Sequence, residues 1–171
     1  KPYNWGIQRN RELQPFEDNL EKWCCSFKHP GDGFTPDELI SSFRTMSQEW
    51  EEGLKILRKL VKNFSRSSVQ ARELAVAEAI NIQFLSCANV IEFYKLRDSS
   101  GNDDKGYLRM KAVAEDDIKL AEKMKPFIKT EPSIGYQAEM QYYSFSEKLI
   151  DEKIGQVQEM LVSLNRKIKG R

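Results

Sequence analysis

The longest patterned stretch of the chain runs from residue 67 to residue 98, where apolar residues recur at steps of three and four. They form two stripes, the first of Ala77, Ile80, Phe84, Cys87, Ile91 and Tyr94, and the second of Ile82, Leu85, Asn89, Phe93 and Leu96. This spacing marks the faces of a helix, and a helix with two apolar faces is covered on two sides. We therefore predict a central helix from Ser67 to Asp98.

The start of the preceding helix carries the clearest local signal in the sequence. Pro36 follows Thr35, and Glu38 lies three residues after Thr35. A threonine N-cap, a proline at the first helical position and a glutamate at the third form a capping box. The spacing predicts a helix from Pro36 to about Asn63. Its expected buried stripe consists of Leu39, Phe43, Met46, Trp50, Leu54, Leu57 and Val61.

A short helix is predicted closer to the N-terminus, from Pro15 to about Phe27. Its apolar face consists of Phe16, Leu20 and Trp23, at steps of four and three. Residues 1–13 show no helical period, although they include Trp5, and we interpret them as a lead-in from a preceding domain. Residues 14–171 are then expected to form a single helical-bundle domain.

Two more helices follow the central one. The first should span about Tyr107 to Lys125, where Pro126 is expected to kink or end it. The second should begin near Ser144 or Ser146, and it carries a nearly heptad stripe. That stripe consists of Ile150, Ile154, Val157, Leu161, Leu164 and Ile168. No strand is evident. The expected fold class is all-α: an antiparallel bundle of four long helices plus the short N-terminal helix.

The segment from Thr130 to Ser144 has no helical period and is long for a link between packed helices, so we expect a long aromatic loop there. It holds three of the six tyrosines. Tyrosine rings present an apolar body with a polar tip, and paired carboxylates can hydrolyse glycosidic bonds. The candidate ligand or interdomain contacts are Tyr136, Glu139, Tyr142 and Tyr143, with Glu131 as a further carboxylate. Alternatively, the tyrosines cover the end of the bundle or face an adjoining domain.

Composition excludes several classes of function. The 27 basic and 26 acidic residues give a net charge of +1, which argues against nucleic acid as a partner. No apolar run approaches the roughly 18 residues of a membrane span. The three cysteines show no Cys-x-x-Cys pair, so we expect no metal site. Cys87 is expected to be a core residue, and a bridge from Cys24 or Cys25 to Cys87 stays open in an oxidising compartment.

Residues that commonly carry catalysis lack the necessary neighbours. His29 is the single histidine and lies in a glycine-rich loop, so a hydrolytic triad has no base. The tip that begins at Asp98 resembles a calcium loop, but Asp103 replaces the required glycine and Arg109 the required glutamate. The acidic run 115–117 points around a helix and should form a solvated face. We expect no catalytic residue, no metal and no cofactor in this chain.

Three segments together resemble a known arrangement: Phe93–Asp98, then Glu115–Ala121, then Ser133–Tyr136 with Glu139 and Tyr142–Tyr143 ahead of the last helix. Their order resembles the helical C-terminal region of large secreted bacterial proteins of the glycoside-hydrolase type. In those proteins a catalytic barrel precedes the helical domain, whose last loop carries an arginine-isoleucine-glycine-aromatic run. Ser133 stands here in place of that arginine.

This resemblance implies a non-catalytic accessory domain of a carbohydrate-active protein. The chain would then be a fragment of a longer extracellular or periplasmic polypeptide. Its partners would be the adjoining catalytic domain and a glycan, and the catalytic acid and base would lie in the barrel. The alternative is a helical-bundle protein–protein interaction module with no carbohydrate role. That alternative predicts an exposed apolar groove along the seam from Ile154 to Ile168.

Overall fold

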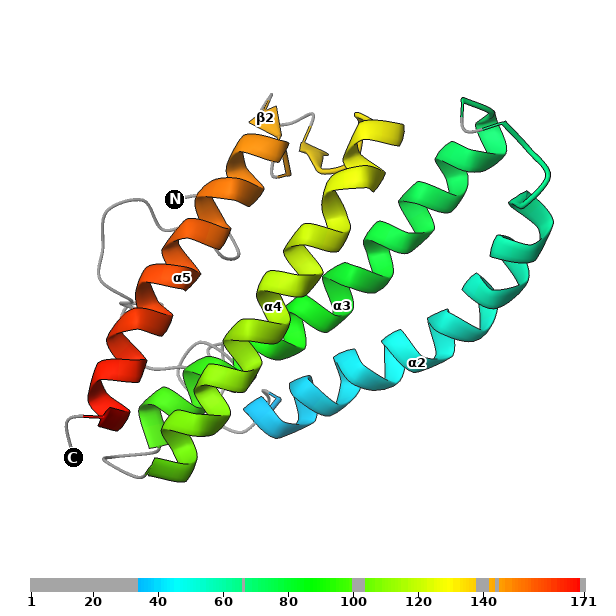
Figure 1. Ribbon diagram of the computed structural model, residues 1–171. Helices are drawn as coiled ribbons and strands as arrows, with labels where there is room; N and C mark the ends of the chain where they lie inside the picture. Colours follow the sequence, from blue (N-terminus) through cyan, green and yellow to red (C-terminus); the bar gives the residue numbers. More distant parts are fainter. Residues whose placement is uncertain (1–33, 66, 100–103, 138–141, 144, 170–171) are drawn as a thin grey trace.

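The computed structural model describes residues 34–65, 67–99, 104–137, 142–143 and 145–169. Four long helices make up most of this part of the chain: α2 (Pro36–Val61), α3 (Val69–Ser99), α4 (Asp104–Thr130) and α5 (Glu147–Lys169). Each helix runs antiparallel to the one before it, with α2 on one flank and α5 on the other (Figure 1). The predicted all-helical class is confirmed. The short helix expected at residues 15–27 and the lead-in at 1–13 lie outside the described residues.

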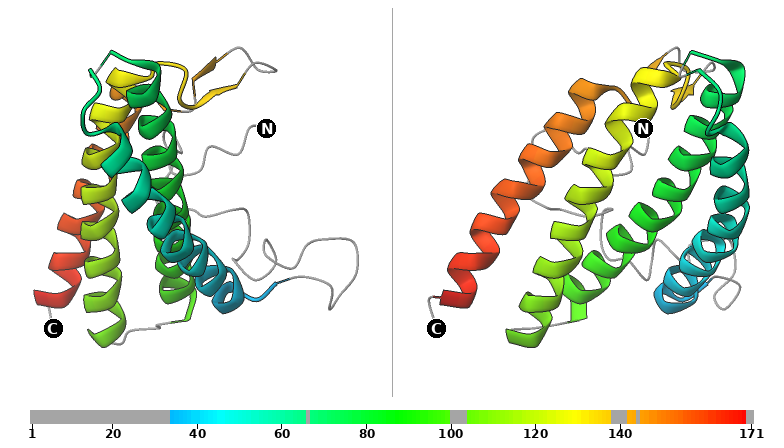
Figure 2. Two further views of the ribbon diagram at one scale, coloured as in Figure 1. Left: turned by 90° about the vertical axis from the view of Figure 1, so that its right-hand side faces the viewer. Right: turned by 45° about the vertical axis from the view of Figure 1, so that its right-hand side comes forward.

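Helix α3 is the central element, because α2 packs on one side of it and α4 on another (Figure 2). The predicted two-sided cover is therefore confirmed. No membrane span was expected from the apolar runs of the sequence, yet among the described residues α3 is one helix long and apolar enough to cross a membrane by length and composition. The core helix of a protein outside the membrane meets the same criterion, and α3 buries polar Glu78, Asn81 and Asn89.

Helix α2 begins with the predicted capping box. The backbone N–H of Glu38 donates to Thr35 Oγ1 at 3.2 Å, and the backbone N–H of Thr35 donates to Glu38 Oε2 at 2.7 Å. The Thr35 hydroxyl also donates to Glu38 Oε2, and these bonds lower the pKa of the Glu38 carboxyl. Two of the free N–H groups at the start of the helix are thereby paired.

The buried stripe of α2 differs from the prediction. Met46 and Trp50 are 38% and 39% exposed, while Ser47 is buried. The hydroxyl of Ser47 donates to Asn81 Oδ1 on α3 at 2.6 Å. Leu54 and Val61 of the expected stripe are buried as predicted, whereas in the first half of the helix Ile40 and Ser47 are buried in place of Leu39 and Met46. The buried residues of α2 are Ile40, Ser47, Leu54 and Val61.

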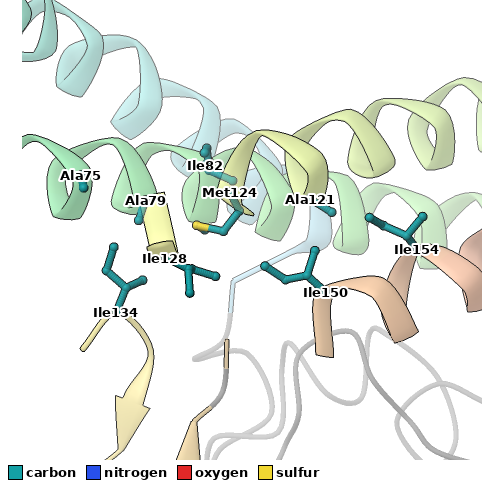
Figure 3. Packing of buried hydrophobic residues seen from close by; sticks show 9 residues of the cluster. All are labelled: Ala75, Ala79, Ile82, Ala121, Met124, Ile128, Ile134, Ile150 and Ile154. Atoms are coloured by element: carbon teal, nitrogen blue, oxygen red, sulfur yellow. The ribbon is translucent and has the colours of Figure 1, made fainter. Parts of the chain in front are cut away.

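The largest apolar core joins α3, α4 and α5 (Figure 3). It consists of Ala75, Ala79 and Ile82 from α3, Ala121, Met124 and Ile128 from α4, Ile134 from the following turn, and Ile150 and Ile154 from α5. A second cluster lies farther along the same helices and includes Met160 and Leu164 of α5. The stripe of the last helix thus packs against α4, and the seam from Ile154 to Ile168 is not an open groove.

Helix α4 extends past Pro126, which was expected to kink the helix or to end it near Lys125. It continues through Pro126 to Thr130. A proline inside a helix removes one backbone donor. However, Ile128 is buried in the core beyond it, and the Thr130 hydroxyl donates to the Pro126 carbonyl at 3.0 Å. Burial of the last turn outweighs the lost hydrogen bond.

The segment expected to be an aromatic loop contains a short antiparallel ladder, so the prediction of no strand is wrong here. Strand β1 (Tyr136–Gln137) pairs with β2 (Tyr142–Tyr143), with Tyr136 opposite Tyr143. Helix α5 then begins at Glu147 and is capped by Ser146, whose Oγ accepts from the backbone N–H of Leu149 at 3.3 Å.

Candidate functional site

The hairpin after α4 brings three of the four predicted contact residues together. Tyr136 is 47% exposed and lies opposite Tyr143 in the ladder. Tyr142 is the other residue of β2. The fourth, Glu139, lies outside the described residues. Gly135, with a φ of 78°, turns the chain into β1 in the left-handed region that favours glycine.

Glu131 holds the turn that leads into this hairpin. Its Oε1 accepts from the backbone N–H of Ser133 at 3.0 Å and from the Ser133 hydroxyl at 2.6 Å. These bonds lower the pKa of the Glu131 carboxyl. Its other oxygen lies 3.9 Å from Arg72 Nε at the start of α3. Glu131 is therefore committed to the turn, which supports a structural role over a catalytic one.

Several exposed apolar side chains lie at the same end of the molecule as the hairpin. They lie where α2 gives way to α3, and the hairpin lies at that end in both orientations of Figure 2. We call this set the aromatic end: Ile56 (62% exposed), Leu60 (64%), Phe64 (50%), Val69 (57%) and Tyr136 (47%). The sequence contained a signal for three of them, because Ile56, Leu60 and Phe64 follow one another at steps of four.

Buried polar side chains of α3 tie the helices together along their length. Glu78 is buried and accepts a hydrogen bond from Arg58 Nε of α2 at 2.5 Å. Lys123 Nζ of α4 lies 3.9 Å from the same carboxylate. Hydrogen bonds to Glu78 and to Glu51 raise the pKa of Arg58. One carboxylate therefore binds a cation from each neighbouring helix.

The same arrangement recurs two heptads along α3, at Glu92. It accepts from Arg44 of α2 and from Arg109 Nε of α4, the latter at 2.6 Å. The carboxylates are 14 residues apart, and so are the two cations on α2 and the two on α4. Equal spacing on three antiparallel helices indicates that these contacts fix their register. We call the contacts of Glu78 and Glu92 the two clamps.

An open hollow lies between α2 and α4, above the polar face of α3. It measures about 710 Å³ and is lined mainly by polar side chains: Ser47, Gln48, Glu51, Glu52, Arg58, Glu78, Asn81, Leu85 and Lys123. A volume of this size admits a small ligand. However, none of the buried side-chain nitrogen and oxygen atoms in the described residues is without a hydrogen-bond partner. The buried and half-buried polar groups of the hollow therefore bind one another, as Ser47, Asn81, Glu51, Arg58 and Glu78 do.

A second polar contact joins α5 to the other helices. Lys153 Nζ lies 2.6 Å from Asp117 Oδ2 and donates to Ser86 Oγ at 3.1 Å. The Ser86 hydroxyl donates to Asp117 Oδ1 at 2.6 Å. Asp117 is buried, so the prediction that the acidic run 115–117 forms a solvated face is wrong at this residue. An ammonium donating to both neighbours cannot take a proton from serine, and the contact is not a catalytic dyad.

A narrow pocket of about 50 Å³ lies beside this contact. It is lined by apolar side chains of α3, α4, α5 and the segment just before α5, together with Gln83, Ser86, Cys87 and Lys153. It is large enough for a water molecule but too small for a sugar ring. Burial raises the pKa of the Cys87 thiol to about 11, so this half-buried free cysteine is a poor nucleophile.

Among the described residues no group of three or more histidine, cysteine or acidic side chains could hold a metal ion. Comparisons of the chain with protein-family models, with curated proteins and with solved structures find no match. The resemblance to the helical region of glycoside-hydrolase-type proteins therefore stays a prediction. At the aromatic end, exposed apolar side chains lie at the same end of the molecule as the predicted contact residue Tyr136.

Proposed function

We propose that this chain is a non-catalytic accessory domain of an extracellular or periplasmic carbohydrate-active protein. In this proposal the aromatic end contacts an adjoining catalytic domain or a glycan. The observation that carries it is that four exposed apolar side chains around the α2–α3 connection and the hairpin with exposed Tyr136 lie at one end of the helices. Exposed apolar residues scattered singly are ordinary, whereas a cluster marks a contact surface.

The internal contacts of the helices support a binding role over a catalytic one. The two clamps and the Lys153–Asp117 contact pair the buried charges with one another. A rigid set of helices can hold the hairpin in a fixed position, and binding surfaces on rigid supports lose little entropy when a partner docks. The segment that resembles the family motif, Ser133 to Tyr136, forms the turn and first strand of that hairpin.

The proposal is tested with Tyr136→Ala and Phe64→Ala in the whole chain, together with the matched control Leu108→Ala. Leu108 is 54% exposed but lies near the start of α4, at the opposite end of the molecule. Binding to a panel of soluble polysaccharides and docking to the catalytic region of the longer protein are both measured. We expect the two variants at the aromatic end to lose about tenfold in one of these affinities, or about 1.4 kcal/mol. The control should lose nothing. Unchanged behaviour of both variants in both assays would contradict the proposal.

The alternative, a protein–protein interaction module without a carbohydrate role, is favoured by one observation. Ile56 and Leu60 on α2 are more exposed than Tyr136 of the hairpin. A partner helix lying along these residues would depend on α2 and not on the hairpin. Loss of protein docking in Leu60→Asp, with full docking in Tyr136→Ala and no polysaccharide binding in either, would support this second function.

A further inference from the structure

Helix α3 has a third face that the described helices leave partly open. It lies between the faces covered by α2 and by α4, and each of its residues is half-buried. They follow one another at steps of four, three, four, three and four: Val76, Ile80, Gln83, Cys87, Val90 and Tyr94. Within the described residues α2 and α5 make no contact with each other, so these two flanking helices do not close over this face.

The elements on both sides of this face also present apolar side chains. On the α2 side, Met46 and Trp50 are 38% and 39% exposed. On the α5 side, Phe145 and Leu149 line the narrow pocket that Cys87 also lines. The face is therefore an apolar strip with apolar borders, and an occupant with an apolar stripe of its own would bury side chains on three elements.

We propose that residues 15–27 of this same chain form an amphipathic helix that lies along the third face of α3. The segment carries Phe16, Leu20, Trp23 and Phe27 at steps of four, three and four. A helix of this length spans about 20 Å, and the strip from Val76 to Tyr94 spans about 27 Å. The segment therefore fits the strip in length and in pattern, and this inference does not depend on the proposed function.

The connection to α2 favours one direction for the docked helix. The start of α2 lies beside the end of α3, because Lys95 Nζ is 2.5 Å from Asp37 Oδ1 and Tyr94 packs in the cluster that contains Ile40. Residues 28–35 can reach about 26–29 Å when extended, so Phe27 can lie near Tyr94. The helix would then run from the Val76 end to the Tyr94 end, parallel to α3 and antiparallel to α2.

Two adjacent native cysteines provide a matched test. Cys24 lies four residues after Leu20 and so on the side of the apolar stripe, whereas Cys25 lies two residues after Trp23 and points away from it. In the whole chain, Cys25→Ser leaves Cys24 and Cys87, and Cys24→Ser leaves Cys25 and Cys87. Each variant is treated with a short bis-maleimide under native conditions. Intramolecular cross-links are separated from intermolecular ones by mass.

We expect the intramolecular cross-link to Cys87 to form about tenfold faster from Cys24 than from Cys25, since docking raises the effective concentration of only one thiol. The difference should vanish in urea. Equal rates in the two variants under native conditions would overturn the proposal. A cross-link found only between two chains would also overturn it, and would assign the face to a second copy of the protein.

A second measurement addresses the apolar contact itself. In a chain whose single cysteine is Cys87, Leu20→Asp should speed the alkylation of Cys87 about tenfold if docking contributes about 1.4 kcal/mol. Lys22→Asp also introduces an aspartate, but on the opposite side of the helix, and should leave the alkylation rate of Cys87 unchanged. Circular dichroism verifies that both variants keep their helices. Equal alkylation rates in the two variants would overturn the proposal.

Discussion

Gly135 determines the path of the chain from α4 into the hairpin. Its φ of 78° lies in the left-handed region, and a Cβ at this position would approach Phe145 Cδ2 to 2.4 Å and the Phe145 backbone nitrogen to 2.9 Å. An L-residue here combines backbone strain with a clash against backbone that cannot easily move. A single glycine therefore decides whether Tyr136 is presented at the aromatic end.

Gly135→Ala should lower the free energy of unfolding by about 1–3 kcal/mol, measured by urea denaturation. Gly155→Ala is the matched control, because a Cβ there meets nothing within 4 Å and the residue lies inside α5. This second change should stabilise the protein by about 0.5–1 kcal/mol through its helix propensity. Equal stability of Gly135→Ala and the unchanged chain would contradict the strain described at the turn.

The reactivity of Cys87 follows from its burial. Because burial raises its pKa to about 11, only a small part of the thiol is ionised at neutral pH. In a chain whose single cysteine is Cys87, we expect the alkylation rate by iodoacetamide to keep rising with pH until about pH 11. The same chain in urea should level off near the ordinary cysteine pKa of about 8.5. Matching pH profiles in the two states would show that burial does not control this thiol.

At the scale of elements, the sequence predicted those features that depend on local chemistry. The capping box at Thr35 needs only residues three apart, and the two-sided pattern of α3 needs only periodicity. The orientation of α2 depended on a partner, since Ser47 turns inward to meet Asn81. The passage of α4 through Pro126 depended on the burial of Ile128. Which face of α2 is buried and where α4 ends are determined by tertiary contacts, which cannot be read from a single sequence.

In the candidate site, too, the local features could be predicted from the sequence and the tertiary contacts could not. The tyrosine-containing segment was identified from its length and composition, whereas its ladder and the neighbouring Phe64 and Leu60 were not. Pairing of Tyr136 with Tyr143 requires the turn at Gly135, which carries no periodic signal. The clamps were equally hidden, because the residues that meet at Glu92 are separated by 48 and 17 positions along the chain.

The clamp at Glu78 is expected to stabilise the contact between α2 and α3. Glu78→Gln should lower the free energy of unfolding by about 1–3 kcal/mol, since the buried group loses its charge-assisted hydrogen bonds to Arg58. Lys123→Met removes a cation that is 53% exposed and 3.9 Å away, and should cost below about 1 kcal/mol. Thermal unfolding of both variants distinguishes the two effects. A larger loss of stability in Lys123→Met than in Glu78→Gln would show that Lys123, and not Arg58, is the main partner of Glu78.

Arg58 of the clamp at Glu78 also binds Glu51, and this second ion pair should make the free energy of unfolding sensitive to acid. Hydrogen bonding to Arg58 lowers the pKa of Glu51 from its ordinary value of 4.5. A folded-state pKa below the unfolded one gives stability that is present above pH 4.5 and is lost as the pH falls through the folded value. Glu51→Gln should therefore flatten the acid side of the curve of unfolding free energy against pH. An unchanged acid limb would show that this pair contributes nothing measurable.

At the scale of the whole molecule, α5 is a flanking helix with one close neighbour, as α2 is on the other flank. Among the described helices its backbone lies close to α4 alone, although Ile150 and Ile154 share an apolar cluster with α3. Lys153 adds a polar contact to α3, because it donates to Ser86 of α3 as well as binding Asp117 of α4. The position of the hairpin depends on this attachment, since its second strand precedes α5 in the chain.

Lys153→Met should therefore destabilise α5 more than the rest of the molecule. Removing one partner of a buried ion pair leaves an uncompensated charge and costs about 3–5 kcal/mol, while replacing both partners by apolar residues is often neutral. Lys153→Met combined with Asp117→Leu should accordingly recover most of the loss. Hydrogen exchange should show faster opening of the α5 amides in the single variant, with the α3 amides slower to open. Uniform acceleration across all helices would mean that α5 unfolds together with the others. In that case the hairpin could not loosen through α5 while α2, α3 and α4 stay packed.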